Sequence, residues 1–373
     1  MPDRPRLRIA LLGETGGPGG AERIMLQLAV ELRARGHEII PIGPARRNPW
    51  LRAQFRERGF DTRTFTLRAP LDPLCLAEIG SLIRRARVDL VHTHEFFTSV
   101  YGGAAAWALR KPHVITMHGG RYYAGRRYRR AALRWSVRRS RGLVAVSAAT
   151  ATDLTRTLGL SASAVRVIHN GIRHEPGDAT KLRGELGMAA GELLIVAVGN
   201  LYPVKGHAVL LRALAQLEQD AALPRWRLAI AGRGAAEAAL REFVAAQGWE
   251  GRVHLLGFRD DVSDLLAAAD VFALPSLSEG LPLALAEAMW GGKAIVASRT
   301  GGIPEVVTHG GEGFLAPPGD ERALAACLRE LLTQPDLRQR LGEAARRGAT
   351  ERLSVERMVD EYERLYAAAT QRM

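Results

Sequence analysis

The chain has 373 residues, of which 47% are hydrophobic and 24% charged, a composition that predicts a soluble globular protein with room for two domains and excludes a disordered chain. No apolar run approaches the roughly 20 residues that span a bilayer, and the apolar stretch near the N-terminus is too short for a secretion signal. The two cysteines, Cys75 and Cys327, lie far apart, which predicts reduced thiols in a cytoplasmic protein and no zinc site.

The net charge of +13 raises the question of an anionic partner. Residues 121–141 contain nine arginines, and Arg126, Arg130, Arg134 and Arg138 recur every four residues with aromatic and apolar residues between them. This spacing predicts a basic amphipathic helix. The helix suits a solvated surface or contact with an anionic membrane. The sequence carries no nucleic-acid-binding motif, so we expect no nucleic acid partner.

Strand-like runs alternate with helical patterns along the first half of the chain. Strands are predicted at residues 7–13, 38–42, 89–93, 114–117, 143–146 and 165–168, and a helix at 21–35. Residues 172–191 are polar and glycine-rich and predict a linker.

The same alternation begins again after this segment. Strands are predicted at residues 193–198, 228–231, 253–256, 271–274, 294–297 and 313–315, and helices at 207–217, 322–332, 337–347 and 355–368. Two series of alternating strands and helices favour an α/β protein with two Rossmann-like, doubly wound parallel-sheet domains facing a cleft.

Polar and glycine-rich residues gather where the predicted strands end, the edge at which open parallel sheets bind ligands. In GNLYPVKGH, residues 199–207, a glycine turn and Lys205 precede a helix. Backbone N–H groups, the helix dipole and the lysine together suit a phosphate, although a solvent-exposed lysine at a helix start is an equal alternative.

Glu279 and Glu287 are eight positions apart in PSLSEGLPLALAEAM. The first lies in a loop and the second in an otherwise apolar helix, where a carboxylate is costly to bury without a partner. Carboxylates accept hydrogen bonds from diols, so Glu279 suits sugar hydroxyls and Glu287 a ribose. The backbone amides of Gly280 and Leu281 add donors at the helix start. The alternative is that both glutamates are structural.

The loop GETGGPGGAE in the first half has glycines at five positions: Gly13, Gly16, Gly17, Gly19 and Gly20. Their spacing fits a dinucleotide fingerprint poorly, and we expect a loop that lets an acceptor approach the backbone. His118, in TMHGG, is a candidate to donate to a substrate hydroxyl. His92 and His94 are more typical of structural histidines, although His94 is kept as an acceptor-binding candidate.

Taken together, these segments resemble the family-four retaining glycosyltransferases of the GT-B fold, also described as glycosyl transferases group 1. The resemblance extends over nearly the whole chain, through TMHGG, VIHNGI, VGNLYPVKGH and LAIAGRG, and it is most specific in the E-x7-E motif between ADVFALPS and GGKAIVAS. It implies a metal-independent hexosyltransferase without a cofactor that moves a sugar from a nucleotide diphosphate sugar to a glycan, glycolipid or small molecule.

The resemblance also implies roles for individual residues. Glu279 would hold the donor sugar, Glu287 the ribose, and Lys205 the departing diphosphate, with His118 reaching the sugar from the other domain. The donor-binding set is then Asn200, Lys205, Gly232, Arg233, Phe258, Glu279, Gly280, Leu281 and Glu287. The acceptor-binding set is Gly16, Gly17, Gly19, Gly20 and His94.

The resemblance further implies domains at residues 1–175 and 176–352, with residues 353–373 forming a helix that crosses back to the first domain. Envelope polysaccharide or lipopolysaccharide synthesis at the inner face of the membrane would fit such an enzyme. Asp260 and Asp261 do not form a metal-binding motif and are interpreted as a helix cap.

One departure from the family pattern concerns Asn200, where the family usually has arginine. Asparagine forms a weaker hydrogen bond to phosphate than a guanidinium does, so Arg233 or Arg299 is expected to compensate. A non-catalytic nucleotide-sugar-binding protein is the alternative that this departure favours.

Overall fold

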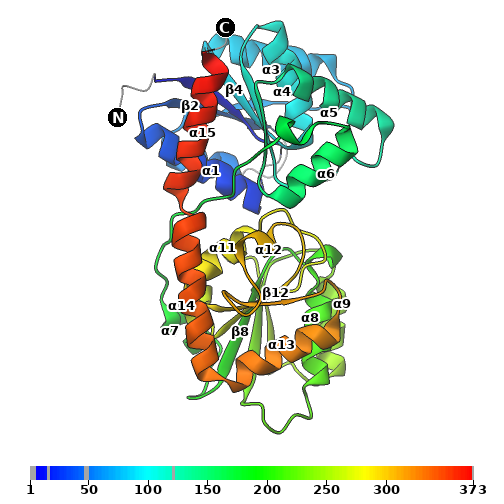
Figure 1. Cartoon of the computed structure of the whole chain (residues 1–373), viewed down its shortest axis with the longest axis vertical. Helices are drawn as coiled ribbons and strands as arrows, with labels where there is room; N and C mark the ends of the chain where they lie inside the picture. Colours follow the sequence, from blue (N-terminus) through cyan, green and yellow to red (C-terminus); the bar gives the residue numbers. More distant parts are fainter. Residues whose placement is uncertain (1–5, 15–16, 46–49, 120–121, 372–373) are drawn as a thin grey trace. The chain divides into compact units, whose positions relative to one another are not determined.

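The structure is a computed structural model that describes residues 6–14, 17–45, 50–119 and 122–371 (Figure 1). The chain divides into two compact units. Unit 1 contains Met1–Gly171 and Val355–Met373, and unit 2 contains Ile172–Ser354.

Unit 1 is built on a seven-stranded parallel sheet in the order β3-β2-β1-β4-β5-β6-β7. Its strands are β1 (Arg8–Leu12), β2 (Glu38–Pro44), β3 (Arg63–Phe65), β4 (Leu90–His94), β5 (His113–Met117), β6 (Gly142–Ala145) and β7 (Arg166–Val167). The edge strand β3 was not predicted, because three residues are too few to show an alternating pattern. The other strands lie where the sequence predicts them.

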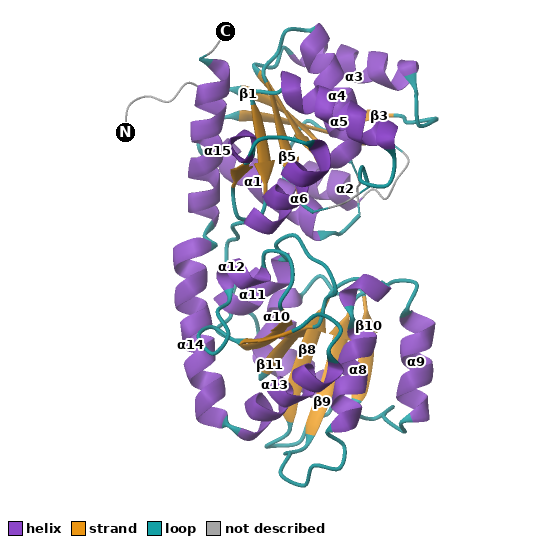
Figure 2. Cartoon of the chain, turned by 45° about the vertical axis from the view of Figure 1, so that its right-hand side comes forward, coloured by secondary structure: helices purple, strands orange, loops and turns teal. Residues whose placement is uncertain are grey.

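Helices cover both faces of this sheet (Figure 2). They are α1 (Gly20–Ala34), α2 (Trp50–Glu57), α3 (Pro73–Ala86), α4 (Glu95–Ala108), α5 (Arg127–Arg139), α6 (Ala148–Leu158) and α15 (Val355–Thr370). Helix α4 packs between α3 and α5, whereas α1 packs beside α15. Local signals set their starts: in α3, for example, the Asp72 carboxylate accepts from the Cys75 N–H at 2.9 Å, and Pro73 occupies the first turn.

The C-terminal helix α15 is joined to unit 1 by buried polar contacts. Glu363 accepts from Arg35 at 2.8 Å and lies 3.1 Å from His37 Nε2. The Tyr366 hydroxyl lies 2.8 Å from His92 Nδ1. Because such groups are costly to leave unpaired in the interior, α15 is an integral part of unit 1.

Unit 2 has a six-stranded parallel sheet in the order β10-β9-β8-β11-β12-β13. The strands are β8 (Leu193–Val198), β9 (Trp226–Ala231), β10 (Val253–Gly257), β11 (Val271–Leu274), β12 (Ala294–Ser298) and β13 (Phe314–Ala316). The chain adds strands outward from β8 to β10 and then returns to place β11 beside β8. The predicted α/β fold with two doubly wound parallel sheets is confirmed.

The helices of unit 2 are α7 (Ala179–Glu185), α8 (His207–Gln216), α9 (Glu237–Ala246), α10 (Val262–Ala268), α11 (Leu283–Trp290), α12 (Ile303–Val306), α13 (Glu321–Thr333) and α14 (Pro335–Arg352). Helix α8 packs against α9 and α13, and α10 packs against α7 and α11. Across the helices of the described ranges, none combines the length and apolar character that crossing a membrane requires.

The prediction of a linker over residues 172–191 is wrong in part, because helix α7 lies within it. Asp178 caps the helix by accepting from the Thr180 N–H at 2.9 Å. Lys181 donates to Asp264 of α10 at 2.7 Å, and Leu182 is fully buried. These tertiary contacts stabilise a helix in a segment whose local composition favours a loop.

Candidate active site

The main candidate site lies where the strand order of unit 2 reverses, between β8 and β11. At such a point open parallel sheets bind ligands outside the carboxyl edge of the strands. Residues 199–206 follow β8 and residues 275–282 follow β11. The Leu277 N–H donates to the Val204 carbonyl at 2.8 Å. Gly206 has φ +68°, and a Cβ there would lie 2.0 Å from the Pro275 carbonyl oxygen, so only glycine allows the two loops to approach.

Lys205 and Glu279 meet directly across these two loops. The Lys205 ammonium donates to both carboxylate oxygens of Glu279, at 2.7 and 3.0 Å. The Ser276 hydroxyl donates to Glu279 Oε1 at 2.6 Å. The Glu279 side chain is only 7% exposed, so these donors offset much of the cost of removing its charge from water.

The loop that follows β12 packs against the backbone of the Glu279 segment. The Gly302 N–H donates to the Gly280 carbonyl at 2.6 Å. Gly301 has φ +56°, and a Cβ there would lie 2.0 Å from the Glu279 carbonyl oxygen. Leu281 is buried, and half-buried Glu287 lies on α11, about two helical turns beyond Glu279. The two glutamates therefore belong to one continuous loop–helix segment.

The loop that follows β9 packs against the loop that follows β8. A Cβ at Gly232 would lie 1.9 Å from the Gly199 carbonyl oxygen, and the Leu201 N–H donates to the Arg233 carbonyl at 2.9 Å. Asn200 and Arg233 are both exposed. Within the described ranges, neither side chain makes a hydrogen bond or an ion pair. Both remain available to a ligand at this edge.

Phe258 completes the predicted donor-binding set, and Arg299 is the alternative to Arg233 as the cation that compensates for Asn200. Phe258 is half-buried and directly follows β10, the strand at one edge of the sheet. Arg299 is exposed in the loop after β12, on the other side of β8 and β11. Arg233 is therefore the candidate whose loop directly contacts that of Asn200.

The interpretation of Asp260 and Asp261 as a helix cap is wrong for the Asp261 side chain. Asp261 occupies the N-cap position of α10, but its carboxylate makes no capping hydrogen bond. It accepts instead from Arg259 at 2.8 and 2.6 Å. A guanidinium that offers two parallel donors competes successfully with the backbone amides.

A second cluster of candidate residues lies in unit 1, where β4 and β5 end. His94 Nδ1 and His118 Nε2 are 2.8 Å apart and share a hydrogen bond. The backbone N–H of His118 donates to Glu95 Oε1 at 3.0 Å. Glu95 itself has φ +68°, a strained conformation for a residue with a side chain. The sequence did not predict that His94 and His118 touch.

This histidine pair has unused hydrogen-bonding capacity. Burial lowers the pKa of His118 to about 4 and the pKa of His94 well below its ordinary value, so both rings are neutral near pH 7. Their other nitrogens, His94 Nε2 and His118 Nδ1, are buried without a hydrogen-bond partner among the described residues. Either tautomer leaves one N–H donor and one acceptor for a ligand hydroxyl.

His92 is structural, as the sequence favours. It lies 2.8 Å from Thr116 Oγ1 and 2.8 Å from the Tyr366 hydroxyl, and Thr116 in turn lies 2.9 Å from the Tyr362 hydroxyl. These contacts connect β4 and β5 to α15 in the interior of unit 1.

The glycine-rich loop of unit 1 leads into α1. Gly16 lies outside the described residues; Gly17 precedes the helix, Gly19 is its N-cap and Gly20 its first residue. Burial raises the pKa of Glu22, whose carboxylate folds back over this helix start: a Cβ at Gly19 would lie 2.3 Å from one of its oxygens. A carboxylate thus occupies the position that a phosphate would take at this helix N-terminus.

Two family models match the chain, one for each half. The model described as Glycosyltransferase Family 4 matches residues 18–176, and the model described as Glycosyl transferases group 1 matches residues 178–348. Together they cover the candidate residues of both units except Gly16 and Gly17, and they confirm the resemblance drawn from the sequence.

Curated relatives and solved structures agree with this assignment. The N-acetyl-alpha-D-glucosaminyl L-malate synthase of Bacillus anthracis is 28% identical over 93% of both chains. A D-inositol 3-phosphate glycosyltransferase of Xylanimonas cellulosilytica is 29% identical over 96% of this chain and 94% of its own. The crystal structure of Anabaena HepE in complex with UDP-glucose matches with a TM-score of 0.84 and 26% identity, over 97% of this chain and all of HepE. These neighbours confirm the GT-B fold.

The buried histidines predict that unit 1 loses stability in mild acid. Burial lowers the pKa of His92 to about 3, whereas an unfolded histidine has a pKa of about 6.5. Below pH 6.5 the unfolded state takes up the proton first, so stability that is present above pH 6.5 is lost as the pH falls toward 3. A fully shifted histidine contributes about 1.4 kcal/mol per pH unit in this window.

Urea unfolding between pH 7 and 5 measures this dependence. His92→Gln should be less stable than wild type at pH 7 but show a shallower loss of stability on acidification, whereas His309→Gln, at an exposed position in unit 2, should keep the wild-type slope. Equal slopes for wild type and His92→Gln would contradict the prediction.

Proposed function

This chain belongs to the family-four glycosyltransferases, and from that premise we propose that it transfers a hexose-type sugar from a nucleoside diphosphate sugar with retention of the anomeric configuration. It is a glycosyltransferase that uses a nucleotide sugar. The observation that carries the finer proposal is the contact among Lys205, Glu279 and Ser276 at the reversal point of the unit 2 sheet. HepE was solved with UDP-glucose, so UDP-glucose is the first donor to test.

In the ligand-free site, Lys205 and Glu279 neutralise each other. A donor offers a partner to each of them: its diphosphate is a better acceptor for the ammonium, and the sugar hydroxyls are donors for the carboxylate. Lys205 then turns from Glu279 to the phosphate, while Ser276 continues to hold Glu279 in place. The pair therefore keeps both charges paired in the empty site and releases both when the donor arrives.

The transfer step requires stabilisation of the leaving group rather than a protein nucleophile. The bond from the anomeric carbon to the phosphate oxygen breaks, the acceptor hydroxyl oxygen bonds to the same face of that carbon, and its proton passes to the leaving phosphate. The charge that develops on the diphosphate is met by Lys205, Arg233 and the backbone amides at the start of α11. These groups supply the positive charge, so we propose that the reaction is metal-independent and needs no cofactor.

The remaining residues complete the proposed site. Glu287 accepts the ribose hydroxyls, and the end of β10 near Phe258 holds the base. His118 donates to the sugar and its partner His94 lies on the acceptor side, which their unpartnered ring nitrogens support. The acceptor is a glycan, a glycolipid or a small molecule, and the names of the relatives make L-malate and an inositol phosphate worth testing.

We predict different defects for the two glutamates. Glu279→Ala should lower kcat by roughly a hundredfold or more, because the carboxylate acts on the reacting sugar. Glu287→Ala should mainly raise the donor KM by about tenfold, because it removes hydrogen bonds made equally in the ground and transition states. Steady-state transfer from UDP-glucose measures both, and thermal unfolding checks that each variant is folded. Unchanged turnover by Glu279→Ala would rule out its catalytic role.

Arg233 is predicted to supply the cation that Asn200 lacks. Arg233→Gln should weaken UDP binding by about tenfold, the loss expected for one charge-assisted hydrogen bond. Arg299→Gln is the matched control, since it removes the same exposed charge from the other side of the site. Calorimetric titration with UDP compares them, and equal losses in the two variants would show that Arg233 has no special role.

The alternative is a catalytically weak or non-catalytic nucleotide-sugar-binding protein, which the neutral side chain of Asn200 favours. A panel of nucleotide sugars separates the two functions. Binding of a nucleotide sugar without any hydrolysis or transfer would support the alternative.

We also propose that the enzyme acts in the cytoplasm at an anionic membrane surface, on envelope glycans or glycolipids. From Phe96 to Thr152 the chain contains no aspartate or glutamate. Helix α5 and its surroundings expose aromatic rings among the arginines: Trp107, Tyr122 and Tyr128 are 59%, 58% and 57% exposed. Arg129 lies 3.7 Å from the Tyr122 ring centroid. Arginines beside amphipathic aromatic rings suit the headgroup layer.

Charge reversal tests this surface. Arg134→Glu/Arg138→Glu should abolish cosedimentation with phosphatidylglycerol vesicles, because each basic residue near the surface contributes about 1 kcal/mol. Arg340→Glu/Arg347→Glu, on exposed positions of α14, changes the net charge equally and should retain binding. If the control loses binding to the same extent, net charge rather than the α5 surface is responsible; equal binding to duplex DNA would favour a nucleic acid partner.

A further inference from the structure

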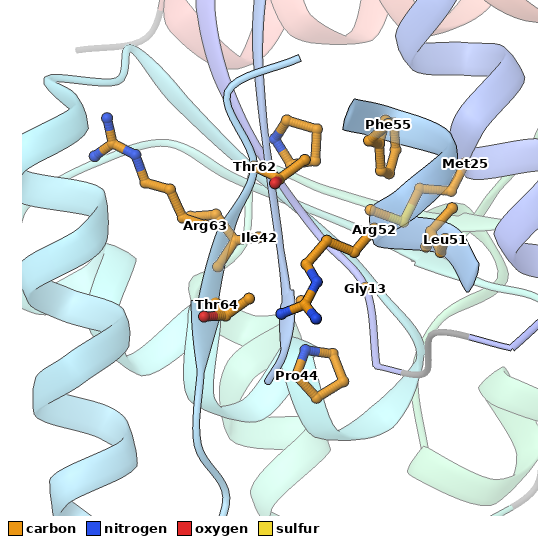
Figure 3. A pocket seen from close by; sticks show the side chains of 12 residues that line it. Gly13, Met25, Ile42, Pro44, Leu51, Arg52, Phe55, Thr62, Arg63 and Thr64 are labelled. Carbon is orange, nitrogen blue, oxygen red and sulfur yellow. The ribbon is translucent and has the colours of Figure 1, made fainter. Parts of the chain in front are cut away.

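Unit 1 contains a pocket that the preceding assignments do not use. It lies beside α2, at the carboxyl ends of β1 and β2 and at the start of the edge strand β3, and it is partly open to solvent. Figure 3 shows its walls. The lining is largely apolar, with Met25, Ile42, Leu51 and Phe55 among its members.

Two arginines line this pocket, and they differ in whether a carboxylate pairs with the guanidinium. Arg63 donates to Asp61 at 3.1 Å, and in Figure 3 its guanidinium points away from the cavity. Arg52 is half-buried and reaches across the cavity toward Pro44 and Thr64. Within the described residues, Arg52 makes no hydrogen bond or ion pair. One guanidinium is thus neutralised, whereas the other faces the pocket without a counter-charge.

The carboxylates near the pocket do not neutralise Arg52. Glu14 follows Gly13, a lining residue, but it accepts from the Phe97 N–H at 2.7 Å. The Glu22 carboxylate lies against Gly19 at the start of α1. A cation in largely apolar surroundings is costly unless it is paired, so this pocket favours a ligand that brings an anion.

We propose that this pocket binds a carboxylate or phosphate group of the acceptor, with Arg52 as its partner. The pocket adjoins Gly13, at the head of the glycine-rich loop assigned to the acceptor, and lies at the sheet edge where this fold binds ligands. The planar guanidinium suits either anion through two parallel hydrogen bonds, and the apolar walls take the carbon skeleton that carries it. The inference rests on the proposed transfer to an acceptor and defines the acceptor as an anionic molecule.

Binding of small anions to the pocket can be measured without sugar transfer. The full chain is titrated by calorimetry with glycerol 3-phosphate and glucuronate as anionic probes, and with glycerol and glucose as their neutral counterparts. We expect the anionic probes to bind more tightly than the neutral ones. Arg52→Gln should weaken the anionic probes by about tenfold or more, and Arg52→Lys should recover part of that loss.

Arg63→Gln is the matched control, because Arg63 lines the same pocket but its guanidinium is already neutralised by Asp61. It should change probe binding less than twofold. Stronger binding of one probe class decides between phosphate and carboxylate.

A separate titration with UDP keeps this inference distinct from the proposed function. Arg52→Gln should bind UDP like wild type, since the donor residues lie in unit 2. Failure of wild type to bind either anionic probe, or equal losses in Arg52→Gln and Arg63→Gln, would overturn the anionic-acceptor assignment. Neither result would affect the donor site, whereas a wild-type chain that fails to bind UDP would overturn the donor assignment.

Discussion

The unit 2 site depends on the Glu279 carboxylate, which is almost completely removed from water. It lies in a loop that approaches the neighbouring loops closely at glycines. Glu279 is stable there because Lys205 and Ser276 donate to it. The contact requires the loops after β8 and β11 to meet, and the strand order places those strands side by side. Gly206 and Gly301 then allow backbone approaches that a Cβ would block. Sheet topology, loop glycines and paired charges are therefore parts of one arrangement.

Unit 1 applies the same topology to different chemistry. Its strand order reverses between β1 and β4, and the Glu14 carboxylate connects the two sides by accepting from the Phe97 N–H. The histidines that follow β4 and β5 are neutral: His94 and His118 share a hydrogen bond and lose their charge through burial. One unit thus offers paired charges that suit a diphosphate sugar, and the other offers neutral imidazoles that suit hydroxyl groups.

Much of the fold could be predicted from the sequence, because the strands of a doubly wound sheet are short apolar runs and the helices repeat at their own period. The strand at Leu193–Val198 matches its prediction at both ends. The misses have two causes. Strand β3 is too short to show an alternating hydrophobic pattern. Helix α7 is stabilised by the Lys181–Asp264 ion pair and by the burial of Leu182, and such tertiary contacts are not visible in a short stretch of sequence.

The sequence by itself determined the family, the two-sheet architecture and the acidic residues of the proposed donor segment, since Glu279 and Glu287 belong to one loop and helix whose spacing is local. Only the tertiary structure decided which side chains meet. It paired Lys205 with Glu279 and His94 with His118, and it turned Asp261 from a cap into a partner of Arg259. Among the described residues it left Arg52 without a hydrogen bond or ion pair, whereas Arg63 donates to Asp61. The net charge of +13 could not separate these arginines, because even partners two residues apart, such as Asp61 and Arg63, meet only when the folded backbone sets the directions of their side chains.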